Sequence, residues 1–417
     1  MFNWYKDSSV PETRTFWACY MGWSLDAMDF MLLAYVLPAL IGVWHISKFQ
    51  GGLLQSATLL AGAFGGWGAG ALSDRYGRVK TLQIMVAWFS VTTVLCAFAQ
   101  NYPQLIVLKT LQGFGFGGEW ATGAVLMAEI IRPQNRGRAL GWIQSGWAVG
   151  WGTALVLSTI VFTYLPHDIA WRALFAVGIL PAFLIIYVRR NLVEPPRAPM
   201  SPAVVKQSAF ADLFAIFKPE VLRSTLVGGL FGVGAHGGYA ALTTFLPTYL
   251  RNEHHLTIMK SGAYMAVIIL AFFFGCIVSG TISDWLGRRL NAAIFAIACI
   301  ITVLLYTFAS PTNNEMLILG FPLGFFAAGI PASMAALFSE MYPVGIRGTG
   351  TGFCYNFGRV VAAGFPALVG FTAKSQGLGA AIGIDTALAY ALVLVAVLLL
   401  PESRQKVLIQ EPAAANA

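Results

Sequence analysis

Apolar residues along this chain come in long runs separated by short polar segments. A helix needs about 20 mostly apolar residues to cross a bilayer, and twelve such runs with short loops use nearly the whole chain. The pattern therefore predicts an all-α membrane protein with twelve transmembrane helices. We expect these helices at residues 15–43, 51–72, 79–98, 103–131, 138–163, 170–189, 223–250, 259–284, 289–309, 314–342, 348–372 and 379–400.

The composition indicates that much of the protein surface contacts lipid rather than water. Of 417 residues, 57% are hydrophobic and only 11% are charged, whereas soluble domains average about 25% charged residues. The five cysteines lie inside apolar runs without a CxxC spacing, which favours buried small hydrophobes over disulfides or metal ligands. We expect no cofactor and no metal, and the polar N-terminal stretch lacks the features of a signal peptide.

The net charge of +8 indicates membrane orientation rather than nucleic-acid binding, because the cations lie in the loops. Most of the 26 Lys and Arg residues fall on the same side as the N-terminus. Basic residues concentrate on the cytoplasmic side of membrane proteins. We therefore predict a bacterial inner-membrane protein with both termini in the cytoplasm. The cations expected on the opposite side are Lys48, Arg172, Arg251, Lys260 and Lys374.

An internal repeat divides the chain. GALSDRYGR at 70–78 recurs as GTISDWLGR at 280–288, and Glu129 with Arg136 recurs as Glu340 with Arg347, at offsets of 210 and 211 residues. The motifs EPPR and PESR repeat after the sixth and twelfth helices. Such parallel halves suit alternating access around a central site. The predicted units are a six-helix bundle at 1–189, a cytoplasmic linker at 190–222, a second six-helix bundle at 223–401 and a tail at 402–417.

The repeated loops are candidates for conformational gating. Asp74 ends a helix, and Gly77 allows a tight turn. The Asp74 carboxylate can accept hydrogen bonds from a nearby helix start or pair with Arg138; alternatively the loop only fixes orientation. The predicted gating residues are Asp74, Arg75, Gly77, Arg78, Glu129, Arg136, Arg138, Asp284, Gly287, Arg288, Glu340 and Arg347.

These loops resemble the signature of the major facilitator superfamily, over the whole chain. LDAMDF at 25–30, GFGGEW at 115–120 and YNFGR at 355–359 are similar to motifs of its aromatic-acid/proton and sialate/proton symporters. Lys109 stands where the superfamily usually has arginine, and Ala27 stands where the aromatic-acid carriers usually have glycine. The resemblance implies two pseudo-symmetric six-helix bundles and proton-driven uptake of a carboxylate.

Ionisable residues inside the predicted helices are the best functional candidates, because a charge at mid-bilayer costs about 2.5–3.5 kcal/mol or more. Asp26 and Asp29 share a helix face, and two adjacent carboxylates repel one another when both are ionised. We therefore expect Asp26, Asp29 or Glu119 to carry a proton. A structural ion pair with an arginine is the alternative.

The predicted anion site centres on Arg359, because a guanidinium matches a carboxylate. A structural salt bridge is the alternative. Asn356 lies three residues earlier on the same helix, and His236 and Tyr239 lie near mid-membrane in the seventh helix. Gln144 is a weaker candidate for substrate contact.

The sequence thus predicts a secondary transporter that takes up a small organic anion, such as an aromatic acid, sialic acid or a monocarboxylate, together with a proton. Its expected partners are the anion, the proton and the lipid bilayer, with no nucleic acid, and we expect it to work as a monomer. Proton-driven efflux and a non-transporting membrane sensor are alternatives. No HExxH, GxSxG or His/Cys cluster indicates an enzyme.

Overall fold

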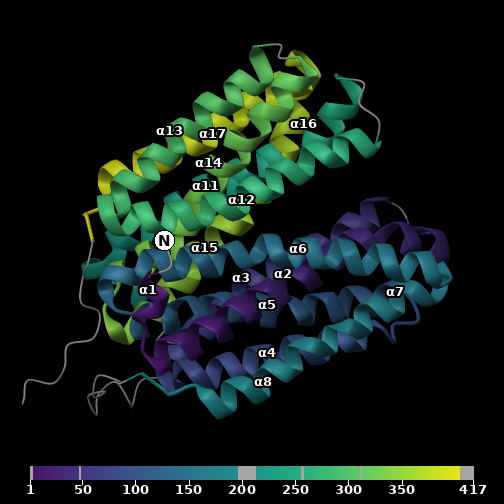
Figure 1. The fold of residues 1–417 in the computed structure, drawn as a ribbon. Helices are drawn as coiled ribbons and strands as arrows, with labels where there is room; N and C mark the ends of the chain where they lie inside the picture. The colour runs from purple at the N-terminus through teal and green to yellow at the C-terminus, as the bar shows by residue number, and fades with distance from the viewer. Residues whose placement is uncertain (1–2, 47, 196–212, 255–257, 310–311, 404–417) are drawn as a thin grey trace, which may run out of the picture.

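The computed structural model describes residues 3–46, 48–195, 213–254, 258–309 and 312–403. Within these ranges the chain is helical without strands. Two helical bundles lie one above the other in Figure 1. We call α2–α8 the N bundle and α11–α17 the C bundle. Residues 196–212 of the predicted linker and 404–417 of the predicted tail lie outside the described residues.

A short helix, α1 (Asn3–Lys6), precedes the first long helix of the N bundle. Ser9 and Glu12 form a capping box at that start, which satisfies the first free N–H groups of the helix. The long helices of this bundle are α2 (Val10–Trp44), α3 (Lys48–Tyr76), α4 (Arg78–Cys96), α5 (Tyr102–Ile130) and α6 (Arg136–Tyr164), followed by α7 (His167–Ala176) and α8 (Leu180–Asn191).

The C bundle repeats this order. Thr312 and Glu315 form a second capping box at the start of its fourth helix. The helices are α11 (Pro219–Asn252), α12 (Ile258–Leu286), α13 (Arg288–Phe308), α14 (Asn313–Met341), α15 (Arg347–Ala362), α16 (Phe365–Gln376) and α17 (Leu378–Leu399).

Two of the twelve predicted spans are interrupted. The span expected at 348–372 is divided into α15 and α16, and the span expected at 170–189 is divided into α7 and α8 around a 3-10 turn at Val177–Ile179. Pro366 and Pro181 each lie in the first turn of the second segment. Proline lacks an N–H and disfavours helix at the preceding residue, so each break has a local cause.

Eight helices of the described chain are long and apolar enough to cross a membrane by composition alone. The helices α3, α5 and α11 and the pair α15/α16 are not among these eight. They are rich in glycine and polar residues, and they pack mainly against other helices. Because protein replaces lipid around them, the twelve-helix fold does not require each helix to be uniformly apolar.

The two bundles meet along α3 with α15 and α6 with α12. A Cβ atom added at Gly70 would overlap the Gly348 carbonyl, and one added at Gly280 would overlap the Gly137 carbonyl. These close crossings lie near the turns at Gly77 and Gly287, and we call this side the motif side. The bundles are therefore in tight contact on the motif side.

Close helix packing within the N bundle yields a stability prediction. A side chain at Gly117 would overlap the backbone of Gly62, whereas nothing lies within 4 Å of the Cβ position at Gly152. We expect Gly117→Val to destabilise the protein by about 1–3 kcal/mol through overpacking, and Gly152→Val to have little effect. Thermal unfolding in one detergent compares the two variants. Equal melting temperatures for both would contradict this packing.

Candidate functional site

A cavity of about 520 Å³ lies between the two bundles. Its walls come from α2, α3 and α6 of the N bundle and from α11, α12, α14, α15 and α16 of the C bundle. Gln55 lines it 19 residues before Asp74 on α3, about 28 Å from the motif side at the helical rise. The cavity therefore extends toward the opposite side, which we call the open side. Its aromatic lining residues are Trp23, Phe30, Trp147, Tyr239, Phe272 and Tyr355.

Arg359 of α15 lines this cavity. Its guanidinium carbon lies 4.5 Å from the ring centre of Phe116 and 5.3 Å from that of Tyr355. Its Nη1 is buried and has no hydrogen-bond partner among the described residues. Aromatic rings on both bundles thus hold a positive charge while leaving donor capacity unused.

His236 and Tyr239 of α11 also line the cavity, together with Gln144 of α6. The His236 ring meets Tyr355 edge-on at 4.5 Å, and its Nε2 is buried without a partner in the described chain. The Tyr239 hydroxyl is hydrogen-bonded to Trp147 of the other bundle. The structure therefore gathers four of the five residues predicted for substrate contact.

Asn356 is the exception. Its side-chain amide donates to the Gly352 carbonyl at 3.0 Å, and it occupies the space beside Gly66 on α3. The residue does not line the cavity. In this conformation Asn356 lies in the α3–α15 interface instead, because Gly66 has no side chain and leaves space for it; its contact with the substrate stays a prediction.

Asp26 and Glu119 form a buried carboxyl pair. Their side chains are hydrogen-bond partners, and Asp26 also attracts Arg359 electrostatically. A hydrogen bond between two carboxyl groups requires a proton on one of them, because two ionised carboxylates have no donor. Their other oxygens, Oδ2 of Asp26 and Oε2 of Glu119, are buried without partners in the described residues.

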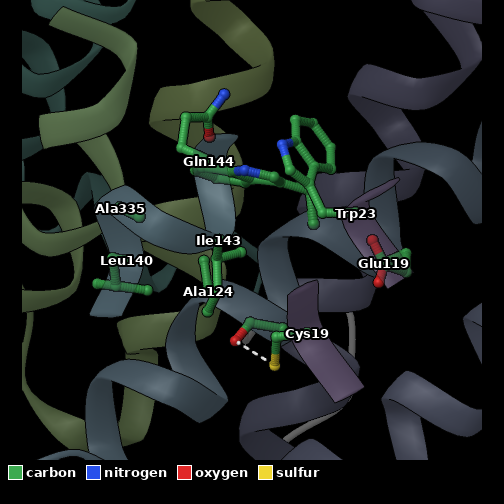
Figure 2. Close-up of a pocket in the computed structure, with 10 residues that line it drawn as sticks. Cys19, Trp23, Glu119, Ala124, Leu140, Ile143, Gln144 and Ala335 are labelled. Carbon is green, nitrogen blue, oxygen red and sulfur yellow. Dashed lines mark hydrogen bonds between the residues drawn. The ribbon is translucent and has the colours of Figure 1, made fainter. Parts of the chain in front are cut away.

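A second, much smaller pocket lies beside Glu119. Figure 2 shows Trp23, Gln144 and Glu119 around it, with the Cys19 thiol hydrogen-bonded to the Gly123 carbonyl at 3.3 Å. Its volume of about 10 Å³ suits about one water molecule. Trp23 and Gln144 line both pockets, so these two side chains separate the Glu119 carboxyl from the large cavity.

Asp29 belongs to a different group. It accepts a hydrogen bond from Thr93 at 2.9 Å and another from Gln112, and it is attracted by Lys109. These partners all belong to the N bundle. Asp29 thus has its own hydrogen-bond partners, while it still repels Asp26 electrostatically, as predicted for two aspartates on one helix face.

The motif-side contacts are duplicated across the interface between the bundles. Asp74 accepts hydrogen bonds from the backbone N–H groups of Gly348 and Thr349 at 2.9 and 2.8 Å. Asp284 accepts from Gly137 and Arg138 at 2.7 and 2.8 Å. Each aspartate thus binds a helix start of the other bundle. Of the two hypotheses for Asp74, the structure matches the helix start rather than an ion pair with Arg138.

Two glutamates join these contacts. Glu129 accepts both arms of Arg78 at 3.1 Å and Nη1 of Arg347 at 2.6 Å. Its repeat equivalent, Glu340, binds Arg288 at 3.1 and 2.9 Å and Arg136 at 2.7 Å. Each glutamate therefore links an arginine of its own bundle to an arginine of the other. We call these two sets of residues, with Asp74 and Asp284, the motif-side clamps.

The remaining gating candidates shape the turns. Gly77 and Gly287 adopt φ values of 110° and 99°, which favour glycine. Arg75 lies over the ring of Tyr76 at 5.9 Å. The glutamate of each tail motif caps the helix that begins after one of these turns: Glu194 accepts from the Val79 N–H group of α4 at 3.0 Å, and Glu402 accepts from the Arg288 N–H group of α13 at 2.9 Å. The sequence repeat revealed these motifs but not their capping role.

Sequence reasoning missed Tyr355 as a site residue. It stacks on Trp120 of the N bundle at 3.4 Å while also contacting Arg359 and His236. The offset of 211 residues pairs Tyr355 with Gln144, which already was a candidate. Comparing the two halves position by position is therefore the signal that could have found it.

Comparisons with known proteins agree with this arrangement. A family model described as Major Facilitator Superfamily matches residues 20–321. The probable 4-methylmuconolactone transporter of Cupriavidus pinatubonensis is 38% identical over 97% of this chain and 94% of its own. The cis,cis-muconate transport protein of Acinetobacter baylyi is 32% identical over 85% and 86%. The solved proton:xylose symporter XylE shares the fold, with a TM-score of 0.76, 16% identity and coverage of 95% and 98%.

The motif-side clamps yield a prediction about conformation. Replacing Asp74 and Asp284 with asparagine removes two charge-assisted acceptors, each worth about 1.5–3 kcal/mol. We expect the motif side to open more often. Spin labels at Lys80→Cys and Gly345→Cys can report this by pulsed electron resonance, since the native cysteines are buried.

The expected result is a new population at longer distance between the labels. Asp168→Asn is the matched control, because Asp168 is exposed at the start of α7. A distance distribution that is the same in the double variant and the control would contradict a closing role for these aspartates.

Proposed function

Because the chain belongs to the major facilitator superfamily, we propose that it takes up a small organic anion together with a proton. Membership of this family, with relatives named as transporters, makes it a multi-pass membrane transporter and not an enzyme. The proposed units of movement are residues 1–189 and 223–401, joined by the linker 190–222. The proposal rests on one observation: the positively charged Arg359 lines the cavity and lies near the buried carboxyl pair of Asp26 and Glu119.

Arg359 supports an anionic substrate. Its unused donor Nη1 suits a carboxylate oxygen, and a charge-assisted hydrogen bond is about twice as strong as a neutral one. His236, Tyr239 and Gln144 add polar contacts on the same cavity wall. The relatives named for muconolactone and muconate point toward the same substrate class.

The Asp26–Glu119 pair supports proton coupling. A proton held between the two carboxyls can leave only when the pair is separated or hydrated. Arg359 attracts Asp26, so a substrate carboxylate competes with Asp26 for the same guanidinium. Protonated Asp26 releases Arg359 to the substrate, and this competition couples the two ligands. Asp29 is left out of this role because Thr93 and Gln112 already hold it.

The motif-side clamps supply the alternating step. Positive charge in the motif-side loops favours a cytoplasmic location for that side, in the bacterial inner membrane and with both termini there. The described conformation then faces outward. Closure of the bundles around both ligands, followed by release of the clamps, delivers them to the cytoplasm. One copy of the chain contains every residue that this cycle requires.

Uptake into proteoliposomes tests the coupling. We expect benzoate or 4-methylmuconolactone to accumulate when the outside is acidic, and the accumulation to collapse with a protonophore. Asp26→Asn and Glu119→Gln should abolish accumulation but retain exchange of labelled for unlabelled anion, because exchange needs no net proton movement. Glu220→Gln is the control, since Glu220 is exposed in the first turn of α11.

Accumulation that persists with the protonophore would refute proton coupling. Export from right-side-out vesicles instead of uptake would refute the proposed direction and favour proton-driven efflux. Binding without movement in either direction would indicate a sensor.

The role of Arg359 has its own test. Arg359→Gln leaves the substrate carboxylate without its cation, and we expect affinity to fall by about 2–5 kcal/mol. The substrate affinity of Arg359→Lys should lie between that of Arg359→Gln and that of the native protein, because lysine keeps the charge but loses the planar fork of donors. Titration calorimetry with the same anions measures both. Lys374→Gln, which removes an exposed charge at the end of α16, should bind normally; equal loss in that control would rule out a specific role for Arg359.

A further inference from the structure

The small pocket beside Glu119 has the size and the polar lining of a water site (Figure 2). Its volume of about 10 Å³ is near the least that holds one water molecule. Two of its lining residues, Glu119 and Trp23, carry buried polar atoms, Oε2 and Nε1, that have no hydrogen-bond partner among the described residues. One water molecule can bond both atoms, because it accepts from an indole N–H group and donates to a carboxyl oxygen.

The pocket lies on the motif side of Glu119. Gly123 lines it one helical turn beyond Glu119 on α5, and this helix ends at Ile130 on the motif side. Leu140 lines it only four residues after the start of α6 at Arg136, which is about 6 Å along the helix axis. The pocket therefore extends from Glu119 toward the side that the motif-side clamps hold closed.

One wall of the pocket belongs to the other bundle. The lining residues lie on α2, α5 and α6 of the N bundle, except for Ala335, which lies on α14 of the C bundle. Release of the motif-side clamps would move α14 away from the N bundle and join the pocket to water on the motif side. Toward the open side, Trp23 and Gln144 separate the pocket from the large cavity. Glu119 thus has an access to the motif side that does not pass through the large cavity.

We infer that this pocket binds one water molecule and is the route by which the proton leaves Glu119 toward the motif side, apart from the path of the anion. The inference rests on the proposed function, since it requires a proton on the Asp26–Glu119 pair. The O–H bond of Glu119 breaks as its proton bonds to the water molecule, which passes one of its own protons to water on the motif side. The Glu119 carboxylate remains. The anion cannot follow, because the pocket holds only one water molecule.

Gly123 allows the pocket to be filled without disturbing the packing. A Cβ atom added there would lie 3.6 Å from the Cys19 sulfur, which is an ordinary contact distance. Because Gly123 lines the pocket, the methyl group of Gly123→Ala takes the volume that the water molecule needs. We expect net uptake of benzoate driven by an acidic outside to slow at least about tenfold, as for loss of a positioned proton-transfer group. Exchange of labelled for unlabelled benzoate should be retained, since it needs no proton release.

Two further variants separate the loss of water from the addition of bulk. Gly123→Ser adds a hydroxyl group that can accept and donate a proton in place of the water molecule, so net uptake should stay within about threefold of the native rate. Gly152→Ala adds a methyl group where nothing lies within 4 Å of the Cβ position, and it should behave as the native protein does. Thermal unfolding of each variant reports whether it is folded.

A second measurement needs no variant. A high-resolution experimental map of the native protein with its motif side closed should show an ordered water molecule within about 3.2 Å of Glu119 Oε2. A dry pocket in that map overturns the inference.

Each transport result decides a separate question. Native net uptake by Gly123→Ala overturns the inference and leaves the proposed function standing. Equal loss of net uptake in Gly123→Ala and Gly123→Ser also overturns it, because bulk would then be the cause, and so does loss of exchange in Gly123→Ala. Absence of proton-driven accumulation by the native protein overturns the proposed function and the inference with it.

Discussion

Charge that is taken out of water needs a partner, and this constraint governs both ends of the interface between the two bundles. On the motif side, Asp74 and Asp284 are buried against backbone N–H groups that only the other bundle supplies. Separating the bundles removes these backbone N–H donors from both carboxylates at once. The same groups that would be costly in isolation therefore stabilise one closed arrangement, and water can replace the lost partners only when the motif side opens.

The central cavity resolves the same constraint differently. Arg359 lies over two aromatic rings, and its Nη1 donor has no hydrogen-bond partner among the described residues. The nearby carboxyls of Asp26 and Glu119 are hydrogen-bond partners, and each keeps one buried oxygen without a partner among the described residues. Positive and negative groups therefore remain incompletely satisfied at the centre, whereas the aspartates and glutamates of the motif-side clamps each accept several hydrogen bonds. A ligand can therefore form the most favourable contacts at the centre, where charged groups of the protein lack partners.

The sequence predicted features that depend on local chemistry or on repetition. Gly77 and its copy had to be glycines at a tight turn, and their positive φ angles follow from that. The position of Asp74 at a helix end indicated a helix start as one of its two candidate partners, and the duplication indicated Asp284 as its copy. The different hydrogen-bond partners of Asp26 and Asp29 could not be predicted, because helix spacing gives the face of a helix but not which neighbours meet it. Glu119 and Thr93 come from other helices and decide the outcome. Likewise Asn356 turned toward α3 because a distant glycine left space there.

The repeat also explains why the cavity is asymmetric while the motif side is not. At an offset of 210 residues, Asp26 corresponds to His236 and Asp29 to Tyr239, so the acidic positions of the N bundle became uncharged or weakly basic in the C bundle. The clamps kept aspartate, arginine and glutamate in both copies. Equivalent residues in the two halves suit the clamps, because the clamps hold the two bundles together through equivalent contacts. The proposed site for one asymmetric anion and one proton needs different residues in the two halves, because a symmetric cavity would present the same charge to both ends of the ligand.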